Sequence, residues 1–388
     1  MMRRRIASAA LAIAATLGGV AHAAAEDTVL IAPHAVMPDG SLRPEVGVLI
    51  DAGGVIRRVV DAADLADHPR ARRLPEGSVL SPGLVDLASF SGVLGANVGV
   101  GDSIDAAPSA IDGFDASAPE LRLSLEGGIT AAMIIPAPNG LVDGACATVR
   151  TGPDASGSHL LHAECALIMC MGEPAFQSPL GPFTRSGAMP VLRRELSQAA
   201  RTPETRLGRS VAGTLPVVAV VSEPEDASAM LRLLGRHDVV PVLVHSTDAL
   251  DIAEEAGAAG ATVILGPFSG NTERRVLAGP AAIAAAGGDV AFSGNAATGG
   301  VDRLRMSAAM AVAHGLPAEA ARRGLTSVSA RVAGVGDRIG SIAAGREADL
   351  VVFTGDPLRL ESRVLEVHIA GRLVHHAHAH SHAHAHAH

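Results

Sequence analysis

The sequence has no tryptophan and no tyrosine, and only seven of its 388 residues are phenylalanine. Recognition of a ligand by stacking on aromatic side chains is therefore not expected. Because 48% of the residues are hydrophobic, the chain can still bury a large core, which must be packed from alanine, valine, leucine and isoleucine. Its length suits one barrel-sized domain and a small additional domain.

A basic stripe is also missing. The formal net charge is −9, and the arginines are not collected into a stripe. We therefore expect neither a nucleic acid nor an anionic lipid surface as a partner. After residue 25 the chain has no uninterrupted apolar stretch of about 20 residues, the length that a membrane-spanning helix needs. We expect no membrane association once the N-terminal segment has been removed.

Residues 1–25 have the pattern of a secretory signal peptide. Three arginines at 3–5 precede an apolar run over 6–20, and Ala-His-Ala at 21–23 is a small-x-small cleavage site. A membrane anchor is the alternative, but the apolar run is short for a span. We predict a mature chain that begins near Ala24 and is located in the periplasm or secreted.

Cysteine is scarce, with Cys146, Cys165 and Cys170 as the full set. An odd number in an oxidising compartment leaves at least one thiol unpaired or pairing between chains. Buried free cysteines are the interpretation that we favour.

The two ends of the chain share one pattern. Short apolar stretches alternate with Asp-Gly and Gly-Gly turns over 26–80, and the pattern returns in ADLVVFTGDP and VLEVHIAGRLV within 338–374. These two parts predict a composite β-sandwich domain. Over 81–337, apolar runs such as PVVAVV and ATVILGP alternate with Ala-rich helical stretches. The fold class is thus α/β, with a (β/α)8 TIM-like barrel favoured and a doubly wound open sheet as the alternative.

Residues 375–388 read HHAHAHSHAHAHAH, and we predict a His-rich disordered tail. Its candidate metal ligands are His375, His376, His378, His380, His382, His384, His386 and His388. Neutral imidazoles bind zinc, copper and nickel, so divalent metal ions are expected partners of this tail. The binding should weaken as pH falls through the range where histidine protonates. The irregular pattern favours a native metal-scavenging tail over a purification tag.

Several long segments carry a resemblance to a known family. GLTSVSARVAGVGDRIGSIAAGREADLVVFTGDPL at 324–358 closely resembles the C-terminal signature of the amidohydrolase superfamily, where the chain leaves the barrel and re-enters the sheet domain. LSPGLVDLASFSG at 80–92 resembles the end of the first barrel strand, and EGGITAAMIIPAP at 126–138 resembles the next unit. Segments 172–196 and 303–321 are similar to imidazolonepropionase-like and prolidase-like periplasmic members.

This resemblance implies hydrolysis of carbon–nitrogen bonds by water activated on one or two divalent metals, with zinc the first choice. In that family a His-x-His pair, often a carbamylated lysine, two later histidines and an aspartate hold the metals. The resemblance places these ligands, in the same order, on Ala88 and Phe90, near Arg150, near Val220, on His245, and on Asn295. One strong ligand, His245, remains where a catalytic zinc needs three. The metal site is therefore predicted to be degenerate, and the barrel to be metal-free.

Two functional hypotheses follow. In the first, the chain is a pseudoenzyme, either a metal-handling scaffold or a partner subunit in a homo-oligomer or with an intact amidohydrolase. In the second, it is a metal-dependent hydrolase of carbon–nitrogen bonds that uses a mononuclear or displaced site around His245, joined by His159 or His162. A hydrogen bond to nearby backbone is an equally good interpretation of His245. Arg150 is either an ordinary ion-paired arginine or a fixed charge that replaces the metal at the barrel mouth.

Overall fold

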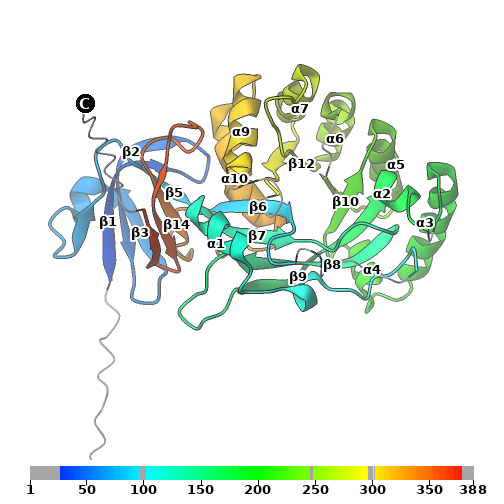
Figure 1. Ribbon diagram of the computed structural model, residues 1–388, viewed down its shortest axis with the longest axis horizontal. Helices are drawn as coiled ribbons and strands as arrows, with labels where there is room; N and C mark the ends of the chain where they lie inside the picture. Colours follow the sequence, from blue (N-terminus) through cyan, green and yellow to red (C-terminus); the bar gives the residue numbers. More distant parts are fainter. Residues whose placement is uncertain are drawn as a thin grey trace, which may run out of the picture.

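The computed structural model describes residues 27–93, 95, 102–179, 181–244, 248–295, 300 and 302–377. The predicted signal peptide, His245 and the histidines from 378 onward lie outside this part of the chain. The described residues form two sheets, one at each side of the molecule (Figure 1). None of the helices in the described ranges combines the length and apolar character needed to cross a bilayer.

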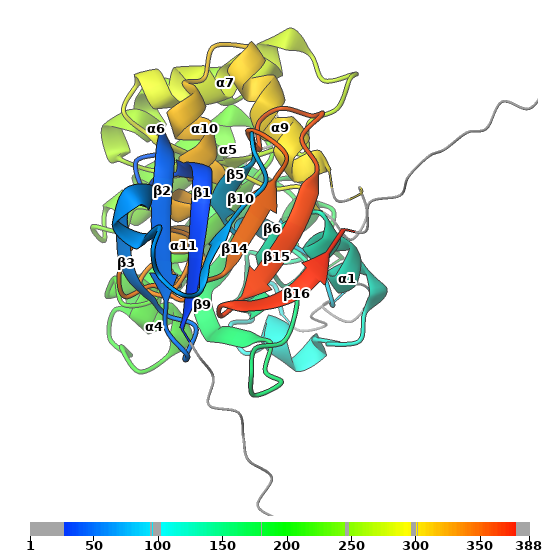
Figure 2. The ribbon, with the colours of Figure 1, turned by 90° about the vertical axis from the view of Figure 1, so that its left-hand side faces the viewer.

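The first sheet is built from both ends of the chain, as predicted. Its strands follow the order β16-β15-β14-β5-β1-β2-β3, and β4 pairs with β1. Figure 2 shows the N-terminal strands in blue beside the C-terminal strands in orange and red. The elements are β1 (Thr28–Val36), β2 (Leu42–Ile50), β3 (Ile56–Asp61), η1 (Ala62–Leu65), β4 (Ala71–Arg73), β5 (Val79–Pro82), β14 (Leu350–Phe353), β15 (Val364–Ile369) and β16 (Arg372–His376).

The start of the predicted tail needs a correction. His375 and His376 are the last residues of β16, which pairs antiparallel with β15 through Val367↔His375 and Glu366↔His376. Backbone hydrogen bonds between the paired strands hold these two residues whatever their side chains are. The start of the tail that was predicted from polar composition is therefore two residues too early.

The second sheet is a nearly closed barrel in the order β13-β12-β11-β10-β9-β8-β7-β6. Its strands are β6 (Leu84–Ser89), β7 (Ile129–Ile134), β8 (Val142–Arg150), β9 (Leu160–Met171), β10 (Val217–Val221), β11 (Val242–Val244), β12 (Thr262–Leu265) and β13 (Asp289–Phe292). At the seam between β6 and β13, the Asp86 carboxylate accepts a hydrogen bond from the Gly294 amide at 2.7 Å. With the separate sheet, this barrel confirms the predicted α/β fold class.

Helices cover the outside of the barrel (Figure 1). They are η2 (Ala110–Gly113), α1 (Pro119–Glu126), α2 (Glu173–Phe176), α3 (Arg185–Ala199), α4 (Arg206–Val211), α5 (Pro224–Gly235), η3 (Ala249–Ile252), α6 (Ala253–Ala259), α7 (Arg274–Ala285), α9 (Arg303–Ala313), α10 (Ala318–Leu325) and α11 (Ser327–Val332). Strand residues such as Leu167 and Val263 pack outward against this layer. Val85, Met133 and Val218 instead pack inside the barrel, together with residues of α11.

One strand departs from the predicted all-parallel barrel. β8 runs antiparallel to both β7 and β9, whereas the remaining neighbours are parallel. The physical reason is the connection from β7 to β8 over 135–141, which contains two prolines and an Asn-Gly turn. A parallel crossover needs about a dozen residues or more, so a segment this short can only reverse the chain.

Candidate functional site

The mouth of the barrel lies at the C-terminal ends of its parallel strands, where enzymes of this architecture place their catalytic groups. Ala88 near the end of β6 is 8% exposed and belongs to the apolar cluster inside the barrel. Phe90, Val220 and Val244 are partly buried and pack against the same cluster. At these positions the strand ends present methyl groups and a phenyl ring, which offer no lone pair to a metal.

The backbone at two of these positions is unusual. Ala88 has φ = 51° and Asn295 has φ = 44°, both in the left-handed region that non-glycine residues avoid. At Ala88 the pairing of β6 with β7 shifts register between Asp86 and Ser89, as in a β-bulge. Bulges re-aim side chains and are frequent beside active sites. The side chain of alanine is a methyl group. The unusual backbone at Ala88 therefore points no polar group into the mouth.

Arg150 is not at the mouth. Because β8 is antiparallel, its last residue lies opposite Ala131 at the start of β7, at the other end of the barrel. Its guanidinium is 1% exposed, its Nε lies 2.9 Å from Asp349 Oδ2, and it donates to Glu347. The hypothesis of a charge that replaces the metal at the mouth is therefore wrong. Arg150 instead ties the barrel to the sheet domain, and it is the ion-paired arginine of the alternative hypothesis.

The two histidines considered for a displaced site lie at that same far end. His159 precedes β9, and its Nδ1 is 2.9 Å from the Arg150 carbonyl, while its ring lies against Phe114. His162 accepts a hydrogen bond from the Glu164 amide at its Nδ1. Val244, which precedes His245, ends its strand at the mouth. These two histidines therefore lie at the opposite end of the barrel from Val244.

A metal of the kind that the family uses does not fit the described side chains at the mouth. Nowhere in the described ranges does a group of three or more His, Cys, Asp or Glu residues come together to hold a metal ion. Asn295 offers a neutral amide, which cannot take up a proton as the family's aspartate does. No hydrolytic step through a bound metal can be derived from this set of donors.

Asp143, which sequence patterns did not single out, is the unusual acidic group at the mouth end of β8. Its Oδ1 accepts hydrogen bonds from the amides of Gly140 at 2.7 Å and Asn139 at 3.2 Å, while its buried Oδ2 has no partner. Burial raises the pKa of Asp143 to about 6, against these amide hydrogen bonds and helped by repulsion from Asp105. In the sequence, the one sign that Asp143 lies at the mouth is its position just after the Asn-Gly turn. We assumed parallel strands and so did not use this sign.

A second polar group lies on the outer face of the other sheet. Arg72 binds Glu366 through two hydrogen bonds of 2.7 Å, and His368 Nε2 lies 3.0 Å from Glu366 Oε2. The hydrogen bond with His368 and the ion pair with Arg72 outweigh burial and lower the pKa of Glu366 to about 2. Both carboxylate oxygens are thus engaged, so this group is a structural ion pair beside the end of β16.

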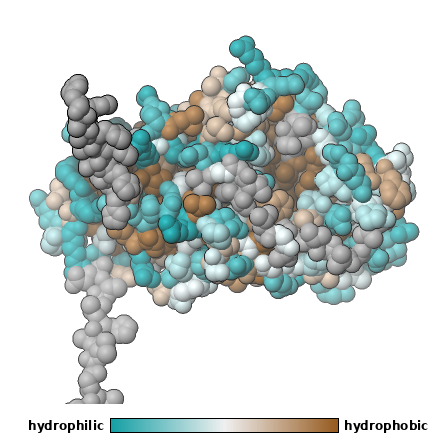
Figure 3. Space-filling model, in the orientation of Figure 1, coloured by the Kyte–Doolittle hydropathy of each residue, from teal (hydrophilic) through white to brown (hydrophobic). Residues whose placement is uncertain are grey.

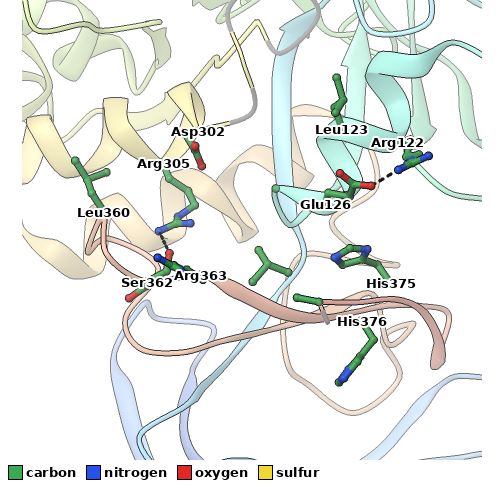
Figure 4. Close-up of a pocket in the computed structure, with 13 residues that line it drawn as sticks. Arg122, Leu123, Glu126, Asp302, Arg305, Leu360, Ser362, Arg363, His375 and His376 are labelled. Carbon is green, nitrogen blue, oxygen red and sulfur yellow. Dashed lines mark hydrogen bonds and ion pairs between the residues drawn. The ribbon is translucent and has the colours of Figure 1, made fainter. Parts of the chain in front are cut away.

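A cavity of about 870 Å³ lies at the junction of the barrel and the sheet domain. Figure 4 places Arg122, Glu126 and His375 on one side of it, and Asp302, Arg305 and Leu360 on the other. Arg305 is buried, and its guanidinium donates to the carbonyls of Pro357, Arg359 and Ser362, so it holds the junction together. The metal positions predicted for the barrel do not line this cavity, whereas His375 and His376 of the predicted tail do.

Comparisons with known proteins agree with this architecture. Residues 196–375 match the sequence model of the amidohydrolase family. A stretch of 66 residues is 39% identical to the amidohydrolase tasK of Hapsidospora irregularis and covers 17% of this chain but 7% of that protein. The match to the family's sequence model covers a little less than half of the chain, and over that part the chain is similar to the amidohydrolase family.

Solved structures share the fold. An amidohydrolase from Thermotoga maritima MSB8 superposes with a TM-score of 0.79 at 23% identity, over 90% of this chain and 100% of that one. A prolidase complexed with N-methylphosphonate-L-proline gives a TM-score of 0.54 at 18% identity, with the same coverage. Members of this superfamily usually bind a divalent metal. The apolar side chains at the mouth of this barrel differ from the ligands that such a metal needs.

Proposed function

We propose that this chain is an exported pseudoenzyme of the amidohydrolase superfamily, whose barrel does not carry out metal-assisted hydrolysis and whose C-terminal histidines bind divalent metal ions. The observation that carries the proposal is the packing of Ala88, Phe90 and Val220 into the apolar interior at the strand ends. Three protein ligands are the usual minimum for a catalytic zinc, and these three positions supply none.

The chemistry of hydrolysis supports the same conclusion. Water bound to a metal must lose a proton, which a nearby carboxylate receives. The family's carboxylate position is occupied by Asn295, and Arg150 is bound to Asp349 and Glu347 at the opposite end of the barrel. The protein thus keeps the scaffold of the superfamily while the groups for its reaction have been exchanged.

The metal-handling part of the proposal rests on the tail. His375 and His376 end β16 at the protein surface, and six further histidines follow from His378 onward. Alternating imidazoles suit zinc, copper and nickel, and a strand end on a stable sheet gives the tail a fixed anchor. The N-terminal pattern at 1–25 supports export.

Metal content tests the proposal. The protein should be truncated after Ala377, because a cut after Val374 would remove two residues of β16. We expect the truncated protein to fold, by circular dichroism, and to carry far less than one zinc, iron or manganese per chain by mass spectrometry. The full-length chain is the control, and it should bind zinc at neutral pH and release it toward about pH 5. About one tightly held metal in the truncated barrel would contradict the proposal.

A hydrolase with a displaced site is the second candidate, and Asp143 is the observation in its favour. A carboxyl group with a pKa of about 6 beside the mouth is suited to acid–base chemistry near neutral pH. The test is turnover of dipeptides, cyclic amides and lactones by the protein truncated after Ala377 and by its Asp143→Asn variant. Turnover that is lost in the variant would establish this candidate, and no turnover in either protein would remove it.

A further inference from the structure

Two of the three cysteines lie beside each other inside the barrel. Cys146 in β8 and Cys165 in β9 are both buried in the interior apolar cluster. Their thiol groups are close enough for each to shift the pKa of the other. Cys170, farther along β9, packs with the outer layer instead.

The pairing of the strands explains this approach. Cys146 lies opposite Ala166, so Cys165 is next to its direct partner in the ladder. Partners across an antiparallel pair have Cα atoms about 4.5–5.5 Å apart, which puts the Cα atom of the next residue at about 6 Å. Disulfides join Cα atoms about 4.4–6.8 Å apart.

A local irregularity turns both side chains to one face. In a regular ladder, Cys165 would point to the opposite face from Ala166 and hence from Cys146. The register shifts here, because Cys146 pairs with Ala166 whereas Thr148 pairs with His162, so β9 contains extra residues between the two pairs. The extra residues let Cys165 face the interior, where a Cβ atom added at Gly334 would lie 3.2 Å from the Cys165 Cβ atom.

The surroundings give the two thiols different pKa values. Burial raises the pKa of Cys146 well above its usual value. Burial also acts on Cys165, but hydrogen bonds with Cys146 and Thr148 outweigh it and lower the pKa of Cys165. One thiol therefore gives up its proton more readily than the other. Thiol–disulfide exchange needs such a thiolate as the attacking group.

We propose that Cys146 and Cys165 form an intramolecular disulfide that joins β8 to β9, and that Cys170 remains as the free thiol. The oxidant is a small-molecule or protein disulfide. The thiolate of one of the two cysteines attacks one sulfur of that disulfide and releases one thiol. The thiolate of the other cysteine then attacks the protein sulfur of the mixed disulfide, which forms the Cys146–Cys165 bond and releases the second thiol. Two protein thiols are oxidised, and one external disulfide is reduced to two thiols.

The bond must form while the chain folds, because both sulfurs are buried once the barrel is complete. The structure has all three cysteines free and buried, as the sequence predicted. With the proposed bond, Cys170 would be the one that stays free. The bond also has a structural role, since β8 and β9 form the antiparallel hairpin that interrupts the parallel barrel. A covalent link within this hairpin would hold it in the irregular register.

The test is to refold the full chain from denaturant in a glutathione redox buffer, with refolding under excess dithiothreitol as the comparison. Thiol counting after denaturation should give one free thiol in the oxidised protein and three in the reduced protein. Peptide mapping by mass spectrometry should find residues 146 and 165 in one cross-linked fragment that has lost two hydrogens. Three free thiols after oxidation, or a cross-link to Cys170, would overturn the proposal.

Single variants provide matched controls. Cys170→Ala should leave no free thiol and keep the cross-link, whereas Cys146→Ala should leave two free thiols. The oxidised wild type should unfold at a higher denaturant concentration than the reduced protein, and Cys146→Ala should show no such difference. If Cys146→Ala fails to fold, the cross-link map of the wild-type chain decides the question alone.

Discussion

At the scale of single residues, the barrel mouth combines retained backbone geometry with exchanged side chains. Ala88 keeps a left-handed conformation and a bulge that serve no group of its own. A left-handed residue with a Cβ atom is strained by about 1 kcal/mol, and such strain concentrates at functional positions. Under the proposed function, this geometry is what remains of a position that once carried a metal ligand.

Asp143 leads to a prediction about pH. The pKa of this carboxyl is raised from 3.8 to about 6 in the folded protein, chiefly by burial. Between these two values the folded state holds a proton that the unfolded state has lost, so the stabilising contribution is present below about pH 4 and is lost as pH rises to about 6. Asp143→Asn should therefore raise the free energy of unfolding at pH 8 by about 1–2 kcal/mol.

Urea unfolding of the wild type and of Asp143→Asn at pH 4 and pH 8 checks this prediction. At pH 8 the variant should have a higher free energy of unfolding than the wild type. At pH 4 this difference between the two proteins should be smaller. Asp105→Asn is the control, because Asp105 acts on Asp143 through charge repulsion alone and should give a smaller gain. An equal difference between variant and wild type at both pH values would contradict the pKa assignment.

At the scale of elements, sequence patterns predicted the strands and helices but not the direction of one strand. Apolar runs such as PVVAVV and ATVILGP became β10 and β12 because a strand that is buried on both faces must be apolar throughout. The segment 142–150 is also largely buried, and the composition of a strand does not encode its direction. The prolines and the Asn-Gly turn before it were the available signal for a reversal.

The misplacement of Arg150 follows from that one strand. The resemblance placed a metal-ligand position near Arg150, and in a parallel barrel the end of that strand would lie at the mouth. Its partners, Asp349 and Glu347, are separated from it by about half the chain, and sequence spacing does not show such contacts. Asp143 was missed for the same reason, since it is at the mouth because β8 starts there.

Arg150 leads to a prediction about stability. Removing the guanidinium leaves the carboxylate of Asp349, which is 1% exposed, without its ion-pair partner. Breaking a buried ion pair in this way costs about 3–5 kcal/mol. Arg150→Met should therefore lower the free energy of unfolding by about that amount, as measured by denaturant unfolding.

Two further variants separate charge burial from loss of packing. Arg338→Met removes a partly exposed arginine that binds the same Glu347, and it should cost about 1 kcal/mol or less. Adding Asp349→Asn to Arg150→Met should restore part of the stability, because it removes the unpaired charge. If Arg150→Met and Arg338→Met are equally destabilising, the buried cluster does not join the two domains in the way described.

At the scale of the whole molecule, one barrel and one sheet from both termini are held together by Arg150 at one side and Arg305 at another. Figure 3 shows hydrophilic residues over much of the visible face, with hydrophobic residues in separate patches. The barrel and the sheet domain are both present. The function of the protein therefore depends on the side chains at the mouth of the barrel and in the tail.

Restoring ligands at the mouth is the strongest test of that view. If the backbone still has the geometry of a metal site, Ala88→His together with Phe90→His should supply two imidazoles beside the strand end that precedes His245. In the protein truncated after Ala377, this double variant should bind about one zinc per chain, as three nitrogen ligands suffice for a zinc site. Isothermal titration and mass spectrometry would measure the gain.

The matched control is Ala88→Asn with Phe90→Asn, which makes the mouth polar without providing good zinc ligands. Zinc binding by the histidine variant and not by the asparagine variant would show that the scaffold retains the geometry of a metal site and lacks only its donors. If neither variant binds zinc although both fold, the strand ends have also moved away from that geometry. Ala88 and Phe90 would then be part of a repacked core, and the left-handed conformation of Ala88 would need an explanation in packing alone.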